Sequence, residues 1–582
     1  MPRSTRQFAP LIRSFLLGAS LTAAASGIAG CADENDPATH VKKLSDPATR
    51  PAAVIRLDQF FQDAMTRDKD DRNGPTVKPL LAQIVQPLTE ACVAGDLDER
   101  TNAKLIKLLT DTRDPKAEPC IVKALKDYKP DATEEDVRSA ARAVSALKLQ
   151  GAAGPLFDVF TKIKASKPKA ATAYRDVHDA MVVLLDKSWE PQLITYLGRP
   201  VDPKDGNNMR DELFWQTTSA EVLGLMKSTG AIKPLIKVLL SPAKGDMGST
   251  AVLALVKIGK PTIPPTVALL KGEDKDLVDY ARGEALKGAG GDKASADAKK
   301  AVDASYVNTA ALILGTIGRE ETAAPLMDAI AKADDLPRAI IARELTKVPK
   351  TPATLKAFQD AFEKTPLTTS MPSGNGAREA LLEAGANFFD ASLVPWIVKT
   401  AMTMKGEEDS LEPIREASLS AAMKLMTADQ VKVVDDLYNM KATVDGKATT
   451  VGKGFEKEYK ITKDLLAKCE SKVDCYVGKL SDPASQAEDT QFQGIKSAFM
   501  SGVLGNADTR QKIVDAMPKI TNAAVRFFSV QAIDSLSPKG DVAMAQKLQK
   551  IVEDVEATRD PNRIAANGPF KTVIYRLNAR AQ

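Results

Sequence analysis

A proline that opens an apolar helical run recurs along most of this chain. At nine places a proline is followed by aliphatic residues at helical spacing, and successive prolines are about 40 residues apart on average. Proline suits the first turn of a helix, because its missing N–H has no partner to lose there. The period predicts an array of similar helical units that bury their apolar faces against their neighbours. The prolines of the series are Pro79, Pro119, Pro155, Pro191, Pro234, Pro265, Pro325, Pro352 and Pro395.

A second motif precedes several of these prolines. The segments Ala220–Met226 and Ala311–Ile317 share the order alanine, leucine, glycine, and in both the glycine lies 10 residues before the next proline of the series. Weaker copies precede Pro155 and Pro395. Small residues on one face let the first helix of a unit approach its partner closely. The motif therefore predicts pairs of helices, with these residues buried between them: Leu235, Val238 and Leu239 against 220–226, and Leu326, Ala329 and Ile330 against 311–317.

The composition favours helix over strand. Apolar residues make up 44% of the 582 residues and aromatic residues only 5%, while alanine, leucine and lysine occur throughout. The proline signal fades beyond Pro395, but four more helix pairs are expected there: 411–427 with 429–438, 455–469 with 475–480, 491–504 with 510–517, and 523–536 with 542–555. The chain is predicted to be all-α, an α-solenoid of about 13 antiparallel helix pairs over residues 46–560. In its recurring motifs it resembles the HEAT-repeat (armadillo-like) family.

Four segments interrupt this pattern and are expected to be turns or insertions. Residues 66–75 form a polar turn, and the glycine-rich residues 288–297 form a flexible loop that helps to explain the longest interval, from Pro265 to Pro325. Residues 366–375 are a further insertion. Any strand is expected to be confined to the last insertion, 441–454. Residues 561–582 are expected to be a C-terminal tail or capping segment.

The N-terminus has the pattern of an export signal. Residues 1–13 carry three arginines and no acids, and an apolar, small-residue run follows to Gly30. The run ends in Ile28-Ala29-Gly30-Cys31, which resembles the lipobox of bacterial lipoproteins, with isoleucine where leucine is usual. The resemblance implies that residues 1–30 are removed, that Cys31 is lipidated, and that residues 31–45 form a polar tether. The body would then lie in the cell envelope, at the outer membrane of a Gram-negative bacterium, in the periplasm or at the cell surface.

Without Cys31, the chain has an even number of cysteines. In an oxidising compartment Cys92 is expected to pair with Cys120, and Cys469 with Cys475. Four free buried thiols are the alternative. A metal site is disfavoured, because no Cys-x-x-Cys occurs and the two histidines, His40 and His178, are far in sequence from all four cysteines.

We find no pattern that predicts catalysis or a cofactor. Two histidines leave little material for acid–base chemistry, and neither Gly-x-Ser-x-Gly nor a phosphate-binding loop is present. The glycines at 446–454 are wrongly spaced for such a loop. The acidic run 68–74 is similar to a calcium loop, but Arg72 and Pro79 occupy ligand positions. His178 is expected to be a satisfied structural histidine, and Trp189, Trp215 and Trp396 are expected to be core residues.

The body after residue 30 has a formal charge near zero, because three arginines of the signal account for most of the net charge of +4. This gives no electrostatic reason to expect nucleic-acid binding. The sequence favours a non-enzymatic, membrane-anchored envelope scaffold that binds unidentified proteins through its helical-repeat surface. It indicates no cofactor and no small-molecule substrate. The alternatives are a structural spacer without a specific ligand, or a HEAT-like lyase or enzyme-associated subunit.

Overall fold

The computed structural model describes residues 33–288, 296–444, 447–558, 564 and 567–582. Its described part is all-α apart from one short hairpin, and it contains the thirteen helix pairs that the sequence predicts. The first helices of the pairs are α2 (Arg50–Arg67), α4 (Glu99–Thr112), α6 (Glu134–Leu147), α8 (Ala173–Leu184), α10 (Gly206–Leu225), α12 (Gly248–Ile258), α15 (Ala296–Ile317), α17 (Asp335–Leu345), α19 (Ala377–Gly385), α21 (Glu408–Leu425), α23 (Glu456–Cys469), α25 (Gln491–Leu504) and α27 (Ala523–Ser535).

The first nine of the second helices carry the recurring prolines. The second helices are α3 (Val77–Ala94), α5 (Glu118–Lys126), α7 (Ala153–Lys162), α9 (Glu190–Leu197), α11 (Ile232–Leu240), α13 (Ile263–Leu270), α16 (Ala323–Lys332), α18 (Pro352–Lys364), α20 (Leu393–Thr403), α22 (Val431–Tyr438), α24 (Val473–Leu480), α26 (Ala507–Ala516) and α28 (Val542–Ala557). Each of the nine prolines lies within the first three residues of its helix, which confirms the prediction. The four pairs expected beyond Pro395 are also confirmed, with ends that differ by at most three residues.

Among the residues that the structure describes, three α-helices stand outside the pairs. They are α1 (Pro37–Lys43), α14 (Lys275–Gly288) and α30 (Gly568–Arg580). Helix α1 lies inside the predicted tether 31–45, so that segment is partly helical, with Asp36 as its N-cap and His40 buried. Helix α14 fills part of the long interval between Pro265 and Pro325, which the predicted loop 288–297 explains only in part; residues 289–295 of that loop lie outside the described residues. Helix α30 forms most of the predicted tail.

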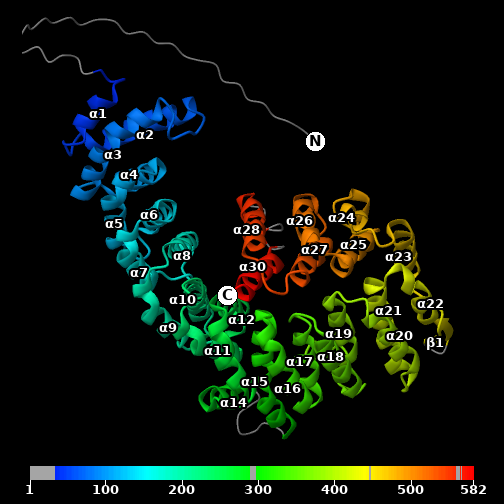
Figure 1. Ribbon diagram of the computed structural model, residues 1–582. Helices are drawn as coiled ribbons and strands as arrows, with labels where there is room; N and C mark the ends of the chain where they lie inside the picture. The colour runs from blue at the N-terminus through cyan, green and yellow to red at the C-terminus, as the bar shows by residue number, and fades with distance from the viewer. Residues whose placement is uncertain (1–32, 289–295, 445–446, 559–563, 565–566) are drawn as a thin grey trace, which may run out of the picture. The chain divides into compact units, whose positions relative to one another are not determined.

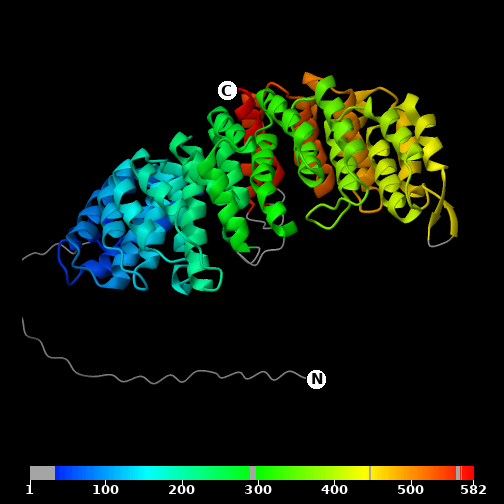
Figure 2. The ribbon, with the colours of Figure 1, turned by 90° about the horizontal axis from the view of Figure 1, so that it is seen from below.

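The expected strand structure lies within the predicted insertion 441–454. Strands β1 (Lys441–Val444) and β2 (Lys447–Thr450) form an antiparallel hairpin, in which Lys441 pairs with Thr450 and Val444 with Lys447. Figures 1 and 2 show this hairpin extending from the neighbouring helices. Within the described residues, the one further strand-like contact is an isolated bridge between Ser370 and Gly376, in the predicted insertion after α18.

The burial predicted for the core residues of the proline helices is largely confirmed, but the predicted partner is not, because α11 packs most closely on α12 and α16 on α17, the first helices of the next units. Leu235, Val238, Leu326 and Ile330 are buried. The prediction was wrong for two positions, which are half-buried: Leu239 and Ala329. Leu239 faces a cavity described below, which leaves it partly open to solvent.

The two glycines that lie 10 residues before a proline of the series have a different role from the one expected. A Cβ on Gly224 would lie 2.6 Å from the Cα of Ala254 on α12, and a Cβ on Gly315 would lie 2.8 Å from the backbone oxygen of Glu344 on α17. The close approach is therefore between first helices of successive units, and not between the two helices of one pair.

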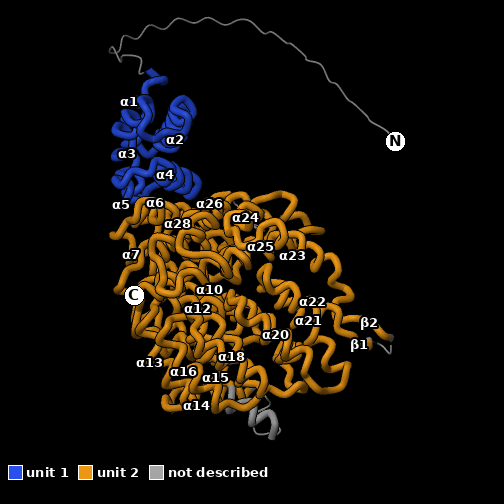
Figure 3. Tube along the Cα trace, turned by 45° about the vertical axis from the view of Figure 1, so that its right-hand side comes forward, with its two compact units in different colours: residues 1–120 blue, residues 121–582 orange. Residues whose placement is uncertain are grey.

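The chain divides into two compact units, residues 1–120 and 121–582 (Figure 3). In the first unit, the Asp68 carboxylate accepts hydrogen bonds at 2.8 Å from the backbone N–H groups of Thr76 and Val77, at the start of α3. The acidic run that is similar to a calcium loop therefore caps a helix. The Cys92–Cys120 disulfide, with a Cα–Cα distance of 5.6 Å, joins the end of α3 to α5.

Candidate binding lumen

Unit 2 closes on itself through its last helix. Eight helices contact one another in sequence, α12, α15, α17, α19, α21, α25, α27 and α30, and α30 contacts α12 again, which completes a ring. All except α30 are first helices of their pairs. The ring omits α23, because α21 packs directly on α25. Figure 1 shows α30, at the C-terminus, beside α12 in the middle of the sequence.

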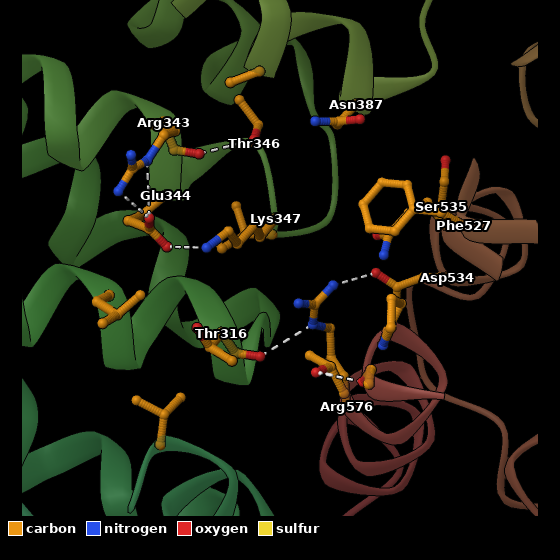
Figure 4. Close-up of a pocket in the computed structure, with 18 of the residues that line it drawn as sticks. Thr316, Arg343, Glu344, Thr346, Lys347, Asn387, Phe527, Asp534, Ser535 and Arg576 are labelled. Carbon is orange, nitrogen blue, oxygen red and sulfur yellow. Dashed lines mark hydrogen bonds and ion pairs between the residues drawn. The ribbon is translucent and has the colours of Figure 1, made fainter. Parts of the chain in front are cut away.

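Every helix of the ring contributes to the lining of a cavity with a volume of 1410 Å³, together with α11 and several connecting segments, and we call this cavity the lumen. Figure 4 shows part of it: Arg343, Glu344 and Lys347 lie on one side, and Phe527 and Ser535 of α27 lie on the other. Its apolar wall includes the half-buried Leu239, Leu253 and Leu312, from α11, α12 and α15. The lumen therefore offers both apolar and charged surface to a ligand.

Positive charge dominates the ionisable groups of the lumen. Two of its three carboxylates are buried, and each is shared by two cations. Glu344 accepts from Lys347 at 2.5 Å and pairs with Arg343 at 3.3 Å, while Asp534 pairs with Arg576 and Arg580. The third carboxylate, Glu383, is exposed. The seven cations that line the lumen are Lys244, Arg343, Lys347, Lys350, Lys424, Arg576 and Arg580.

Two arginines of α30 hold the ring closed. Arg576 donates to the backbone oxygen of Thr316 at 3.0 Å, and Arg580 donates to the backbone oxygens of Gly318 at 2.7 Å and Lys347 at 3.1 Å. These carbonyls stand at the C-terminal ends of α15 and α17, where no intrahelical donor remains. Burial lowers the pKa of Arg580 to about 10, against the opposing effect of Asp534, and the guanidinium stays charged at neutral pH. We call Arg576, Arg580 and Asp534 the clasp.

Two lysines near the C-terminal end of α21, Lys424 of that helix and Lys496 of α25, differ in burial and in hydrogen bonding. Lys496 is fully buried and donates to the backbone oxygens of Lys424 at 3.1 Å and Met426 at 2.6 Å. Burial lowers its pKa, and the side chain serves to cap α21. Lys424 is half-buried at the lumen, where burial lowers its pKa against the effect of Glu383. It has no ion pair within 4.0 Å in the described part of the chain.

Aromatic side chains lead from the core to the lumen. The rings of Phe389 and Phe499 stack with centroids 4.9 Å apart, Phe499 and Phe528 are also 4.9 Å apart, and Phe527 meets Phe528 edge-on at 5.0 Å. Phe389 and Phe499 are buried, whereas Phe527 is 39% exposed. A large aromatic side chain that stays exposed on the wall of a cavity is a feature of binding sites.

A chain of charged groups connects α8, α10, α12 and α30 beside the lumen. His178 contacts Asp179 at 2.9 Å through Nδ1 and Glu221 at 3.2 Å through Nε2. Glu221 also pairs with Lys257 at 3.5 Å, and the Lys257 ammonium lies 4.6 Å from the ring centre of Tyr575. Burial opposes the charge on His178, but its hydrogen bonds to Asp179 and Glu221 raise its pKa to about 9. The hydrogen bond from His178 lowers the pKa of Glu221 to about 2.

The sequence-predicted site residues are placed as follows. Cys31 lies outside the described residues. Cys469 and Cys475 are joined, with a Cα–Cα distance of 5.4 Å, as are Cys92 and Cys120, which are the two pairs that the sequence predicts. Trp189 and Trp215 are buried, but Trp396 is half-buried, and its indole N–H donates to Glu363 at 3.1 Å. The prediction of a core role is therefore wrong in part for Trp396.

The described residues contain neither a candidate metal site nor a single helix that could span a membrane. No group of three or more His, Cys, Asp or Glu side chains in that part of the chain is arranged to hold a metal ion. No single described helix is both long and apolar enough to cross a membrane; by length and composition alone, the bent pair Pro242–Ile258 and Lys260–Leu270 passes, with a bend of 113°.

The lumen and the clasp were missed by the sequence reasoning. The arginines of the clasp are more than 200 residues away in sequence from the backbone oxygens that they contact at the ends of α15 and α17, and a repeat period gives no indication of such a contact. One signal was present: Arg576 and Arg580 are four residues apart on a helix whose other inner residues, Phe570, Val573 and Leu577, are apolar. Two arginines on the apolar face of a helix need buried acceptors, which the sequence could not identify.

Comparisons with known proteins identify no family. No protein-family model and no curated protein matches the chain. Among solved structures, it is similar to importin beta at 12% identity, covering 94% of this chain and 85% of that one, with a TM-score of 0.32. A chain from a study of the cadherin and beta-catenin interaction gives 12% identity, coverage of 93% and 99%, and a TM-score of 0.26. An engineered protein gives 16% identity, coverage of 86% and 99%, and a TM-score of 0.23. TM-scores this low identify neither a family nor a function.

Proposed function

We propose that this chain is a non-enzymatic scaffold of the cell envelope, anchored to a membrane through Cys31, and that it binds a protein partner in the lumen of unit 2. The observation that carries the proposal is a ring of helices around a cavity that combines an exposed aromatic side chain with uncompensated cations. A spacer without a ligand would need no such cavity.

Three properties of the lumen support binding over catalysis. Its ionisable groups are lysines, arginines and three carboxylates, and neither His40 nor His178 lines it. The two buried carboxylates are engaged by arginine or lysine, which leaves neither free to contact a substrate as a general base. The volume of 1410 Å³ exceeds the roughly 300–1,000 Å³ of most small-molecule pockets, which favours a segment of a macromolecule.

Site-specific photocrosslinking in the native envelope tests this proposal. A photoreactive residue replaces Ser535, which is half-buried on the lumen wall, and a matched variant carries it at Lys399, which is exposed on the second helix α20. We expect a defined protein adduct from position 535 and none from position 399. If neither position gives an adduct, or both give the same set of proteins, the binding role is wrong and the spacer alternative is favoured.

A further inference from the structure

The lumen differs in charge from the rest of the chain. Its lining carries seven cations and three carboxylates, although the body after residue 30 is nearly neutral. A fourth carboxylate, Asp390, pairs with Lys350 at 3.5 Å from outside the lining, which still leaves more cations than carboxylates. The two buried carboxylates each sit between two cations, so that both clusters keep an excess of positive charge. The lining of the lumen is therefore more positive than the chain as a whole. An occupant of complementary charge would be acidic.

Apolar groups on the same surface define a second requirement. Phe527 is 39% exposed and is supported from behind by Phe528 and the buried Phe499. A rigid aromatic side chain held in this way can act as an anchor for an apolar side chain of a ligand at little cost in conformational entropy. An occupant with only charged groups would leave this anchor in contact with water.

The closure of the ring restricts how an occupant can enter. The clasp ties α30 to the ends of α15 and α17, and α30 also packs on α12. These contacts close the ring on the side of α30, so a partner chain cannot be laid into the ring from that side while they hold. Entry by a free chain end leaves these contacts intact.

We propose that the lumen binds the free end of a protein chain that is acidic and carries apolar side chains, with Lys424 and Lys347 contacting its carboxylates and Phe527 contacting an apolar side chain. This inference rests on the proposed function and specifies the partner. Lys424 lies on α21, and Lys347 follows the end of α17. Two lumen cations, Lys424 and Lys244, have no ion pair within the described residues, but Lys244 is buried and donates to the backbone oxygen of Leu197 at 2.6 Å.

Binding of synthetic peptides to the purified mature protein tests the proposal. The probe is a fluorescein-labelled peptide of glutamate, serine and glycine with one leucine and one phenylalanine. Three matched peptides carry glutamine for glutamate, lysine for glutamate, or serine for both apolar residues. We expect the acidic, apolar peptide to bind most tightly, with an affinity that falls as salt is raised. Stronger binding of the glutamine or lysine peptide would overturn the proposal.

Variants locate the binding in the lumen. Phe527→Ala should weaken binding of the probe about tenfold, and Lys424→Gln roughly threefold. The matched controls are Met402→Ala, which removes a side chain of similar exposure (40%) on α20, and Lys399→Gln on the same helix. Both controls should leave affinity unchanged. Phe527 is exposed and Lys424 has no ion pair, so the variants should fold, which circular dichroism verifies. Equal effects of variants and controls would refute the lumen as the site.

The requirement for a free end is tested with the same acidic sequence in two contexts. In one it is the tail of a folded carrier protein, and in the other it links two folded carriers that cannot pass through the ring. The tail should bind and the linker should not; equal binding would overturn entry by an end. A dansyl-labelled fatty acid is run in parallel. If it binds in a Phe527-dependent way and the peptides do not, the occupant is a lipid and the inference is wrong. A protein adduct at Ser535 with no peptide binding would likewise refute the inference alone, because the proposed function would stand.

Discussion

Asp534 on α27 accepts a hydrogen bond from Arg580 on α30 at 3.0 Å, and both side chains are buried. The same carboxylate pairs with Arg576, so one acid on the last repeat neutralises part of the charge of two arginines that reach across the ring to α15 and α17. The pair thus fixes α30 to α27, while the two arginines of α30 bind the ends of α15 and α17.

Removing this carboxylate should open the ring. Asp534→Asn leaves two buried guanidinium groups without their acid, and breaking a buried ion pair in this way costs about 3–5 kcal/mol. Hydrogen exchange should rise in α30 and at the ends of α15 and α17, and urea unfolding should report the loss of stability. The control is Asp464→Asn, which breaks an exposed pair with Lys460 and should cost less than about 1 kcal/mol. Equal effects of the two variants would contradict the clasp.

The His178 network should make stability depend on alkaline pH. The folded pKa of His178 is about 9, above its ordinary value of 6.5, because Asp179 and Glu221 stabilise the charged ring. The contribution is therefore fully present below about pH 6.5 and is lost as the pH rises through 9. The stability difference between the wild type and His178→Gln should shrink over this range, as measured by chemical unfolding. Glu221→Gln should reduce the pH dependence in the same window; a difference that stays constant with pH would contradict the network.

The two disulfides should differ in their contribution to stability. The Cys92–Cys120 bridge spans 28 residues and the Cys469–Cys475 bridge spans 6. Loop-closure entropy predicts losses of about 3–4 kcal/mol and about 2 kcal/mol when each pair is replaced by serine. Peptide mapping of the unreduced protein should recover both bridges, and unfolding of the two double-serine variants tests the order. Full alkylation of the native thiols would show that the cysteines are free.

Two leucines on α11 should respond very differently to truncation. Leu235 is buried, so Leu235→Ala should cost about 2–5 kcal/mol through lost burial and a cavity. Leu239 is half-buried on the lumen wall, and Leu239→Ala should cost clearly less because water already reaches it. Thermal and urea unfolding of the two variants measure the difference. Similar costs would mean that the lumen wall is packed and not open.

Membrane anchoring depends on Cys31. Cys31→Ala should release the protein into the soluble fraction or prevent its processing, because two or three acyl chains supply the anchoring energy in a lipoprotein. Fractionation with immunoblotting measures the distribution, and Lys399→Gln serves as the unaffected control. A variant that is processed normally and remains membrane-bound would show that another segment holds the chain to the membrane.

The sequence predicted the repeated helices, but it could not predict the contacts that close the ring. Each proline at the start of a second helix, from α3 to α20, affects only its own helix. The sequence alone was therefore enough to predict where these helices begin. The direction of Gly224 was misjudged, because the motif shows that a small residue is needed but does not show which neighbour approaches it. The contact of Arg576 with Thr316 spans 260 residues and depends on the curvature accumulated over many repeats. No single motif encodes that curvature.

The return of α30 to α12 also bears on how unit 2 unfolds. In an open repeat protein each unit interacts only with its neighbours, so end repeats fray and stability behaves as a one-dimensional sum. A ring has no end repeats between α12 and α30. Melting any one of its helices would open the ring and release the contacts of the clasp together, which makes partial unfolding expensive. This segment is therefore expected to melt as one cooperative block, while the repeats before α12 can fray one at a time.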